Sequence, residues 1–280
     1  MKNTLNKTRK DLLICISGGR SSAMMGYHIH TSPQYADYNK LYVFTNTSME
    51  RKETIEFLQN IKNIWGIPII ALQGIYSTEL KIGVKSQALD FDKLQMNGEV
   101  FSSMIAQVNK YKNIGVPNTA TPYCSDYLKT RVAHDYARNY FGTTQYYKAL
   151  GYRLEDTPKR ISIPELEQNP LLLCPLLTDF NKPISNKELN TFFDHQPFKL
   201  ELHSQYGNCE LCWKKPNALL VKTLQHSTKF VPWHQHHEKK YKNTFFREKK
   251  SIDDLLHLAQ SGTQISLEFD NFSDGCVCTF

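Results

Sequence analysis

The sequence lacks any apolar stretch long enough to cross a membrane, since a transmembrane helix needs about 20 predominantly apolar residues. The first seven residues, Met-Lys-Asn-Thr-Leu-Asn-Lys, also lack the apolar region of a secretory signal peptide. We therefore expect a cytoplasmic protein that does not contact membranes.

A disulfide framework is not expected either, because the seven cysteines occur in a chain without a recognisable export signal. Metal binding or redox chemistry is the better interpretation for those that cluster. Disorder is excluded by the 40% apolar and 12% aromatic content, and 280 residues are enough to bury a full core. The net charge of +7 is compatible with nucleic-acid or nucleotide partners but does not require them.

Two common phosphate-binding motifs are absent, namely Gly-x-x-x-x-Gly-Lys-Ser/Thr and the dinucleotide fingerprint with its spaced glycines. Instead, a buried-strand pattern at residues 12–16 runs into Ser-Gly-Gly-Arg-Ser-Ser at residues 17–22, and a helical pattern follows over residues 21–30. A strand, a glycine turn and a helix N-terminus together form an anion site, because the backbone N–H groups favour negative charge there. The serine hydroxyls and Arg20 add further donors.

The order of the elements predicts an α/β fold. Further strands are expected at residues 41–44, 67–72 and 146–150, and helical patterns at residues 57–65 and from residue 126 to residue 140. Alternation of this kind favours a parallel sheet with helices on both faces. Residues 17–20 and 45–50 would then lie at the same edge of the sheet, where such folds bind ligands. Residues 73–118 show no clear period, and we interpret them as an insertion or a substrate lid.

The motif Ser-Gly-Gly-x-x-Ser after a hydrophobic strand resembles the PP-loop of the N-type ATP pyrophosphatases. This superfamily includes phosphoadenylylsulfate (PAPS) reductases, tRNA thiolation enzymes and DNA phosphorothioation enzymes. Three more segments resemble the PAPS reductase-like branch in the same order, at residues 44–54, 124–129 and 151–160. Ser48 is a departure, because the family usually has glycine there.

The resemblance covers roughly residues 11–215 and implies an adenine nucleotide α-hydrolase-like, Rossmann-like domain at residues 1–200. A cysteine-bearing extension at residues 201–280 would pack near its cleft. The resemblance also implies that ATP, or PAPS or APS, binds with Mg²⁺. The nucleotide-binding residues that it implies are Ser17, Gly18, Gly19, Arg20, Ser21, Ser22, Phe44, Asn46, Thr47, Glu50, Gly151, Arg153 and Arg160. Catalytic roles would fall to Arg20, Lys129 and Arg153.

The residue types agree with some of these roles, although they leave alternatives open. Gly151 would let the backbone approach a ligand, and Arg153 can hold a phosphate with two hydrogen bonds. Glu50 and Glu53 are equally explained as residues that cap a helix N-terminus.

The cysteines give the second strong signal. A Cys-x-x-Cys turn at Cys209 and Cys212 places two sulfur atoms on one metal, and the lysines that follow favour the thiolate form. The candidate ligands are Cys124, Cys209, Cys212 and either Cys276 or Cys278. This layout resembles that of PP-loop enzymes with a four-iron cluster. Zinc is the alternative and a redox dithiol the third interpretation, whereas Cys174 is expected to be a buried packing residue.

The histidine-rich stretch at residues 233–237 is followed by a run of lysines. A solvated basic face is slightly favoured there. The alternative is a nucleic-acid-binding patch with Tyr241, Phe245 and Phe246 as aromatic neighbours, and zinc at the histidines is least favoured.

Three functions follow as hypotheses. The first is ATP-dependent adenylylation, with release of AMP and pyrophosphate, for sulfur transfer to a nucleic acid such as tRNA or DNA, or to a nucleotide. An iron–sulfur cluster and a sulfur donor protein or reductant would assist it. The second is a sulfonucleotide reductase, which the missing Cys-Cys pair and the missing Glu-Cys-Gly-Leu-His tail disfavour. The third is a zinc-stapled binding protein without turnover.

Overall fold

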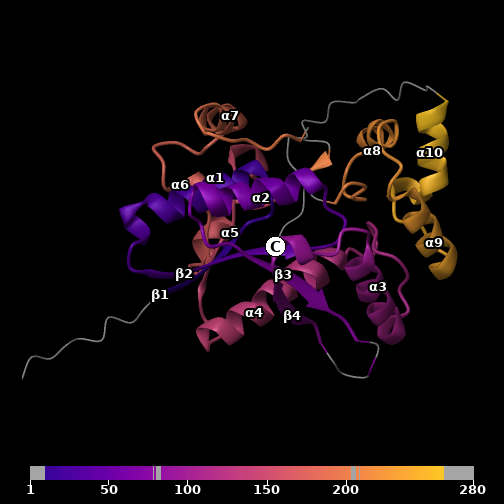
Figure 1. Ribbon diagram of the computed structural model, residues 1–280, viewed down its shortest axis with the longest axis horizontal. Coiled ribbons are helices and arrows are strands. Elements are labelled where there is room, and N and C mark those ends of the chain that lie inside the picture. The colour runs from indigo at the N-terminus through magenta and orange to yellow at the C-terminus, as the bar shows by residue number, and fades with distance from the viewer. Residues whose placement is uncertain (1–9, 78, 80–82, 203–205, 208, 262–280) are drawn as a thin grey trace, which may run out of the picture.

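A computed structural model describes residues 10–77, 79, 83–202, 206–207 and 209–261. It contains a six-stranded sheet in the order β4-β3-β2-β1-β5-β6, flanked by helices, which confirms the predicted α/β fold (Figure 1). The strands are β1 (Lys10–Cys15), β2 (Tyr38–Asn46), β3 (Ile70–Ile75), β4 (Lys85–Leu89), β5 (Tyr147–Ala149) and β6 (Leu172–Leu173). Neighbouring strands are parallel, except that β4 runs antiparallel to β3.

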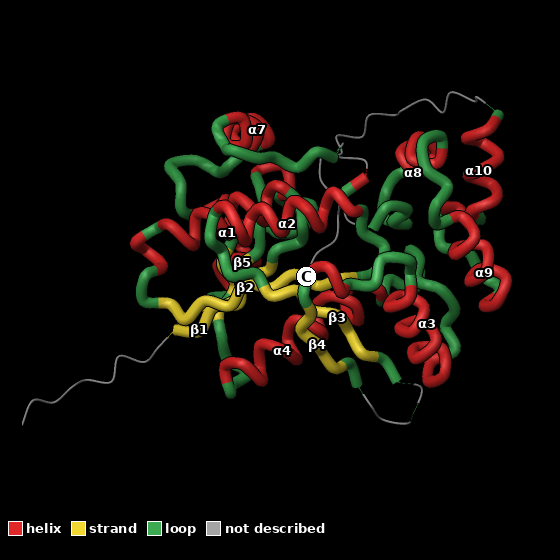
Figure 2. Tube along the Cα trace, in the orientation of Figure 1, coloured by secondary structure: helices red, strands yellow, loops and turns green. Residues whose placement is uncertain are grey.

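Helices cover both faces of this sheet, with α1 and α2 on one side and α4 on the other (Figure 2). The helices are α1 (Arg20–Thr31), α2 (Lys52–Ile64), α3 (Glu99–Lys112), α4 (Arg131–Phe141), α5 (Ile163–Gln168), α6 (Pro175–Thr178), α7 (Asn186–Asp194), α8 (Asn217–Leu224), α9 (Val231–Tyr241) and α10 (Ile252–Gln260). Alternate residues of β1 serve the two faces: Leu12 and Ile14 pack with α1 and α2, and Leu13 packs with α4. None of the described helices is both long and apolar enough to cross a membrane.

The sheet differs from the sequence-based expectation in several details. β2 is longer than the expected residues 41–44, and β6 was not expected. β3 begins three residues later than predicted, after Pro68, which has no backbone N–H to give to a sheet. The region interpreted as an aperiodic insertion contains β4 and α3. The buried face of α3 is formed by Val100, Phe101, Met104, Ile105 and Val108. That spacing is helical and was present in the sequence, but exposed residues on either side obscured it.

The described part of the C-terminal region does not build a core of its own. Residues from α8, α9 and α10 pack together with α3 and with residues 116–128 in what we call the second core. Figure 1 shows these helices gathered at one end of the molecule, with α3 beside the sheet and α8, α9 and α10 beyond it. The predicted boundary near residue 200 therefore separates two segments of chain, but the second core draws on both of them.

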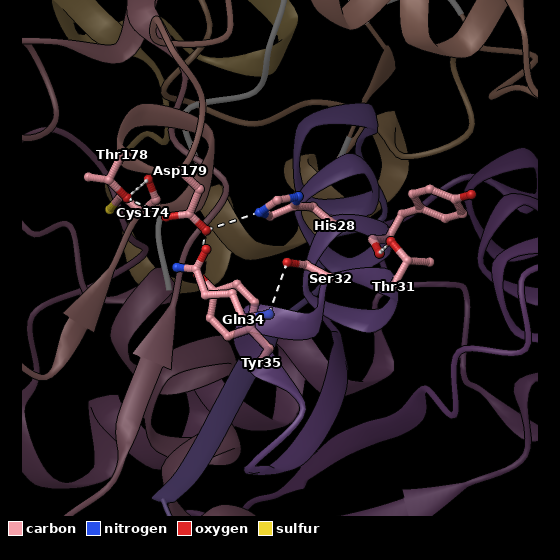
Figure 3. A network of polar contacts seen from close by, with 9 residues as sticks. His28, Thr31, Ser32, Gln34, Tyr35, Cys174, Thr178 and Asp179 are labelled. Atoms are coloured by element: carbon pink, nitrogen blue, oxygen red, sulfur yellow. Dashed lines mark hydrogen bonds and ion pairs between the residues drawn. The ribbon is translucent and has the colours of Figure 1, made fainter.

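A polar network ties the C-terminal end of α1 to the segment after α6 (Figure 3). The Asp179 carboxylate accepts a hydrogen bond of 2.6 Å from the Tyr35 hydroxyl and lies 3.0 Å from Nε2 of His28. Burial alone would raise the pKa of Asp179, but these contacts and one from Thr178 hold it below its ordinary value. The network thus joins distant segments within the sheet-centred part of the protein.

Candidate functional site

Residues 17–22 comprise the tight connection that follows β1 and the first residues of α1, and we call them the glycine loop. Gly18 adopts a positive φ of +79°, and a Cβ atom there would lie 2.5 Å from Cγ2 of Thr54. Only glycine fits without displacement. Phe44, which was expected to flank an adenine, is buried on β2 close beneath Gly18.

Ser22 closes the glycine loop from within. Its hydroxyl oxygen accepts a hydrogen bond of 2.9 Å from the Ser17 amide, and the hydroxyl donates to the Gly19 carbonyl at 2.9 Å. The Ser17 hydroxyl lies 3.0 Å from the same oxygen. The proton of Ser22 is therefore used to hold the loop, which leaves ligand binding to backbone amides and the other side chains.

The N-terminus of α1 lies where parallel sheets commonly bind anions. No side chain caps this helix at its N-cap residue, Gly19. β1 lies between β2 and β5. Strands β2 to β4 are added on one side of β1, and β5 and β6 on the other, so the order of strand addition reverses at β1. Gly151, which follows β5, touches the first turn of α1: a Cβ there would lie 2.9 Å from the backbone N of Ser22. This close approach leaves the uncapped helix end beside the ends of two strands, a setting that favours negative charge.

The arginines that were expected to contact a nucleotide have partners within the protein. Arg20 donates to the Asn190 side chain of α7 at 2.7 Å. Arg153 is only 1% exposed, and it contacts Asn186 and lies 3.6 Å from Asp156. Asp156 also pairs with Arg160 at 2.9 Å. The guanidinium group of each arginine is therefore oriented by side chains of the protein itself.

The turn after β2 is buried and internally hydrogen-bonded. Asn46 donates to Gln73 at 3.1 Å and to a backbone carbonyl at 2.8 Å. The Glu50 carboxylate accepts hydrogen bonds from the amides of Thr47 and Met49 and from the Thr47 hydroxyl. Glu50 therefore shapes the turn that precedes α2, whereas Glu53 is the acidic residue in the first turn of that helix.

Ser48 has a structural role that the family pattern did not suggest. Its φ of +65° lies in the left-handed region, which explains why glycine would suit this position. The Ser48 hydroxyl oxygen also accepts a hydrogen bond of 3.1 Å from the Val100 amide at the start of α3. The N-cap residue of α3 is Gly98, which has no side chain for this purpose. Ser48 thus satisfies the first turn of a distant helix.

Three of the candidate metal ligands meet at one place. Cys124, Cys209 and Cys212 all line a small enclosed space that we call the cysteine cavity, with a volume of about 20 Å³. Its other lining residues are Thr47, Met49, Phe101, Ser125, Leu128, Lys129, Leu211, Trp213, His234 and Phe245. The set includes Lys129, one of the predicted catalytic residues. Trp213 and His234 were not predicted to belong here, and nothing in their local sequence signals it.

Backbone and ionic contacts fix the Cys-x-x-Cys turn to the end of β2. The amide of Glu210 donates to the Met49 carbonyl at 3.1 Å, and the Glu210 carboxylate pairs with Arg51 at 3.0 Å. The two lysines that follow point to nearby partners: Lys214 bonds Ser125 at 3.0 Å, and Lys215 bonds the Glu210 carbonyl at 2.9 Å. The Cys-x-x-Cys turn therefore lies beside the end of β2. The neighbouring strand, β1, leads into the glycine loop.

Polar groups surround the thiols on one side. The Cys209 sulfur lies 3.2 Å from the Thr47 hydroxyl oxygen, and that hydroxyl donates to Glu50 at 2.7 Å. The Trp213 indole N–H donates to the Cys124 sulfur at 3.4 Å. Burial raises the pKa of Glu50, although the charge of Lys129 and the hydrogen bonds from Thr47 oppose this shift. The cavity thus places thiols next to one buried cation and one buried carboxyl group.

The donor chemistry of this cavity suits a thiolate-bound metal or an iron–sulfur cluster, but its present dimensions do not. Within the part of the chain that the structure describes, no three His, Cys, Asp or Glu side chains are placed to hold one metal ion. A volume of 20 Å³ holds a water-sized group, so a cluster would require the lining side chains to move apart. Cys276 and Cys278 lie outside the described residues.

The histidine-rich stretch forms α9, and the expectation of a solvated face is wrong for two of its histidines. His234 and His237 are buried, and burial lowers the pKa of His234 to about 4. Phe245 and Phe246 are also buried in the second core, so they are not available to stack on nucleic acid. The lysines that follow remain exposed, as does His236.

Comparison with known proteins adds one relative. No protein-family model matches the chain. It is 29% identical over 204 residues to the "Uncharacterized nin region protein ORF290" of Escherichia phage lambda. The match covers 72% of this chain and 66% of the phage protein, slightly less than two thirds of its length. The name of that relative states no activity.

Proposed function

We propose that this chain is an enzyme of the PP-loop ATP pyrophosphatase type that uses its cysteines to transfer sulfur to a nucleic acid or a nucleotide. The observation that supports this most directly is the cysteine cavity. Cys124 and the pair Cys209 and Cys212 come from two distant segments, yet all three line one space at the end of β2. The strand next to it, β1, leads into the glycine loop.

The nucleotide half of the proposal rests on the glycine loop and the uncapped N-terminus of α1. The phosphates of ATP would bind the backbone amides there, with Gly151 permitting the close approach. An acceptor oxygen would attack the α-phosphorus, and the bond to the departing pyrophosphate would break. Mg²⁺, when bound, would neutralise charge on the pyrophosphate. A sulfur nucleophile would then displace AMP from the adenylylated acceptor.

The sulfur half rests on the cysteine cavity. Cys124, Cys209 and Cys212, with a fourth thiol from Cys276 or Cys278, would hold an iron–sulfur cluster that carries or activates sulfur; zinc is the alternative. Lys129 lies on the wall of this cavity, so its positive charge would stabilise an anionic sulfur or phosphate group nearby. A sulfur donor protein or a reductant would complete the cycle.

The test measures metal content and ATP chemistry in the full-length protein after anaerobic purification. We expect about four irons and four sulfides per chain, as a four-iron cluster contains. These should disappear in Cys209→Ala but persist in Cys174→Ala, a matched loss of a buried thiol in a different core. Release of AMP and pyrophosphate from ATP is then measured with pooled tRNA and DNA.

Other outcomes separate the alternatives. A content of one zinc and no iron per chain would assign the cysteines a structural role and would count against the sulfur chemistry, but it would not affect the proposed nucleotide site. Sulfite production from PAPS in the presence of thioredoxin would replace the proposal with a sulfonucleotide reductase. Failure to release pyrophosphate from ATP with either pool would count against adenylylation.

A further inference from the structure

Residues of α3 and α9 line a groove on the surface. Figure 1 shows these two helices at the end of the molecule that the second core occupies. The volume of the groove is about 570 Å³, and it is open to solvent along its length. The lining residues are Ser102, Ser103, Ala106, Pro232, Trp233, His236, His237 and Lys240. None of these residues has a role in the nucleotide site or the cysteine cavity, so the groove is a separate feature of the surface.

The segment that includes one wall of the groove accounts for most of the net positive charge of the protein. Residues 226–250 contain seven Lys and Arg against two Glu, which gives +5 of the net +7. One of the two acids, Glu238, is directed at the backbone, where it accepts hydrogen bonds from the amides of Phe245 and Ile252 at 3.1 and 3.0 Å. The other, Glu248, lies 3.8 Å from Lys250. The segment is therefore strongly basic, and it places Lys240 on the wall of the groove.

The floor of the groove is aromatic and rigid. The indole N–H of Trp233 donates to the Ser102 hydroxyl at 2.8 Å, and the Trp233 ring stacks on His237 at 4.2 Å. His237 is further fixed by its Nδ1 contact with the Trp233 carbonyl at 2.8 Å. The exposed side chains of His236 and Lys240 stand one helical turn apart on α9, above this floor.

We propose that this groove binds a single strand of nucleic acid. A positive groove with aromatic side chains is the arrangement that tracks a phosphodiester backbone while it holds bases against flat rings. Lys240 and His236 would contact phosphates, and the half-buried Trp233 ring, backed by buried His237, would form the surface beneath a base. A concave space of this volume between two helices accepts one strand, whereas a duplex is read by an element that projects into its own groove.

The position of the groove connects it to the cysteines. His234, on the same helix as His236, lines the cysteine cavity, and so does Phe101 of α3. The two helices that border the groove therefore also wall the cavity, and a strand in the groove would be separated from the cavity by these helices. As a statement about the acceptor this inference rests on the proposed function, but binding itself needs neither ATP nor a cluster.

Fluorescence anisotropy with labelled, mixed-sequence single strands of DNA and of RNA tests the inference on the full-length protein without ATP. We expect Lys240→Glu to weaken binding about tenfold and to reduce the slope of log affinity against log salt by about 1. Lys187→Glu provides the same change of charge on exposed α7 and should stay within about twofold of the wild type. His236→Ala should weaken binding by a smaller factor.

Three results would overturn the inference. They are no binding of either single strand by the wild type, equal weakening of binding by Lys240→Glu and Lys187→Glu, or displacement of the labelled strand by a duplex as effectively as by an unlabelled single strand. Circular dichroism of each variant confirms folding, since both changed lysines are exposed. A protein that binds the strand but releases no pyrophosphate refutes the proposed function alone. A protein that releases pyrophosphate but binds no strand refutes this inference alone.

Discussion

The glycine loop and the cysteine cavity lie at the ends of neighbouring strands, yet they are built in opposite ways. The glycine loop is closed by hydrogen bonds between Ser17, Gly19 and Ser22, all within six consecutive residues. The cysteine cavity depends on contacts between the end of β2, the segment near Cys124 and the Cys-x-x-Cys turn. The hydrogen bonds that close the glycine loop need only its own segment, whereas the cysteine cavity forms only when distant segments have come together.

The largest expected effect is a loss of stability, and it tests how strongly the cysteine cavity depends on the buried carboxyl group of Glu50. Glu50→Ala should lower the free energy of unfolding by about 3 kcal/mol or more, because it leaves buried donors of Thr47 and Met49 without an acceptor. It also removes the negative charge that faces buried Lys129. Urea unfolding monitored by tryptophan fluorescence measures this loss.

Two further variants separate the contributions of the hydrogen bonds and of the charge to this loss of stability. Glu50→Gln keeps a hydrogen-bond acceptor and should cost roughly 1 kcal/mol. Adding Lys129→Met to Glu50→Ala should recover part of the stability, since it removes the buried positive charge that Glu50 faces. A Glu50→Ala protein as stable as the wild type would mean that the cavity does not rely on this turn.

The same contrast explains what the sequence could and could not predict. The glycine loop was predictable because a strand pattern, two glycines and a helix pattern follow one another directly. The Cys-x-x-Cys pair was recognisable, but its attachment to Met49 was not, because that backbone contact joins residues far apart in sequence. The buried state of His234 and His237 was missed because neighbouring lysines suggested a solvated helix. His234 packs against Phe245 and Phe246, which follow in the sequence, and His237 stacks on Trp233.

A change of intermediate size tests the local site. Gly18→Ala should lower the free energy of unfolding by about 2–3 kcal/mol, because the new Cβ meets Thr54 and the positive φ disfavours alanine. Combining it with Thr54→Ser removes the methyl group that causes the contact, and should restore all but about 1–2 kcal/mol of backbone strain. If the double variant is no more stable than Gly18→Ala, the contact with Thr54 is not the cause.

The remaining effects concern pH, and they have opposite signs in the two parts of the molecule. Asp179, in the sheet-centred part, has a pKa held below its ordinary value by hydrogen bonds from His28, Tyr35 and Thr178, which outweigh the effect of burial. A depressed acid contributes stability that is fully present above its unfolded pKa of about 3.9. That contribution is lost as the pH falls through the lower folded value.

Glu238, in the second core, behaves in the reverse way, because burial raises its pKa from 4.5 to about 7. Between these values the folded state binds more protons than the unfolded state, so stability falls as the pH rises. Urea unfolding from pH 3 to pH 8 should therefore show that Glu238→Gln removes a loss of stability between about pH 5 and 7.5. Asp179→Asn should instead flatten the profile below about pH 4. Identical profiles for the two variants would show that neither carboxyl group titrates as its surroundings indicate, and the two cores would then not differ in their response to pH.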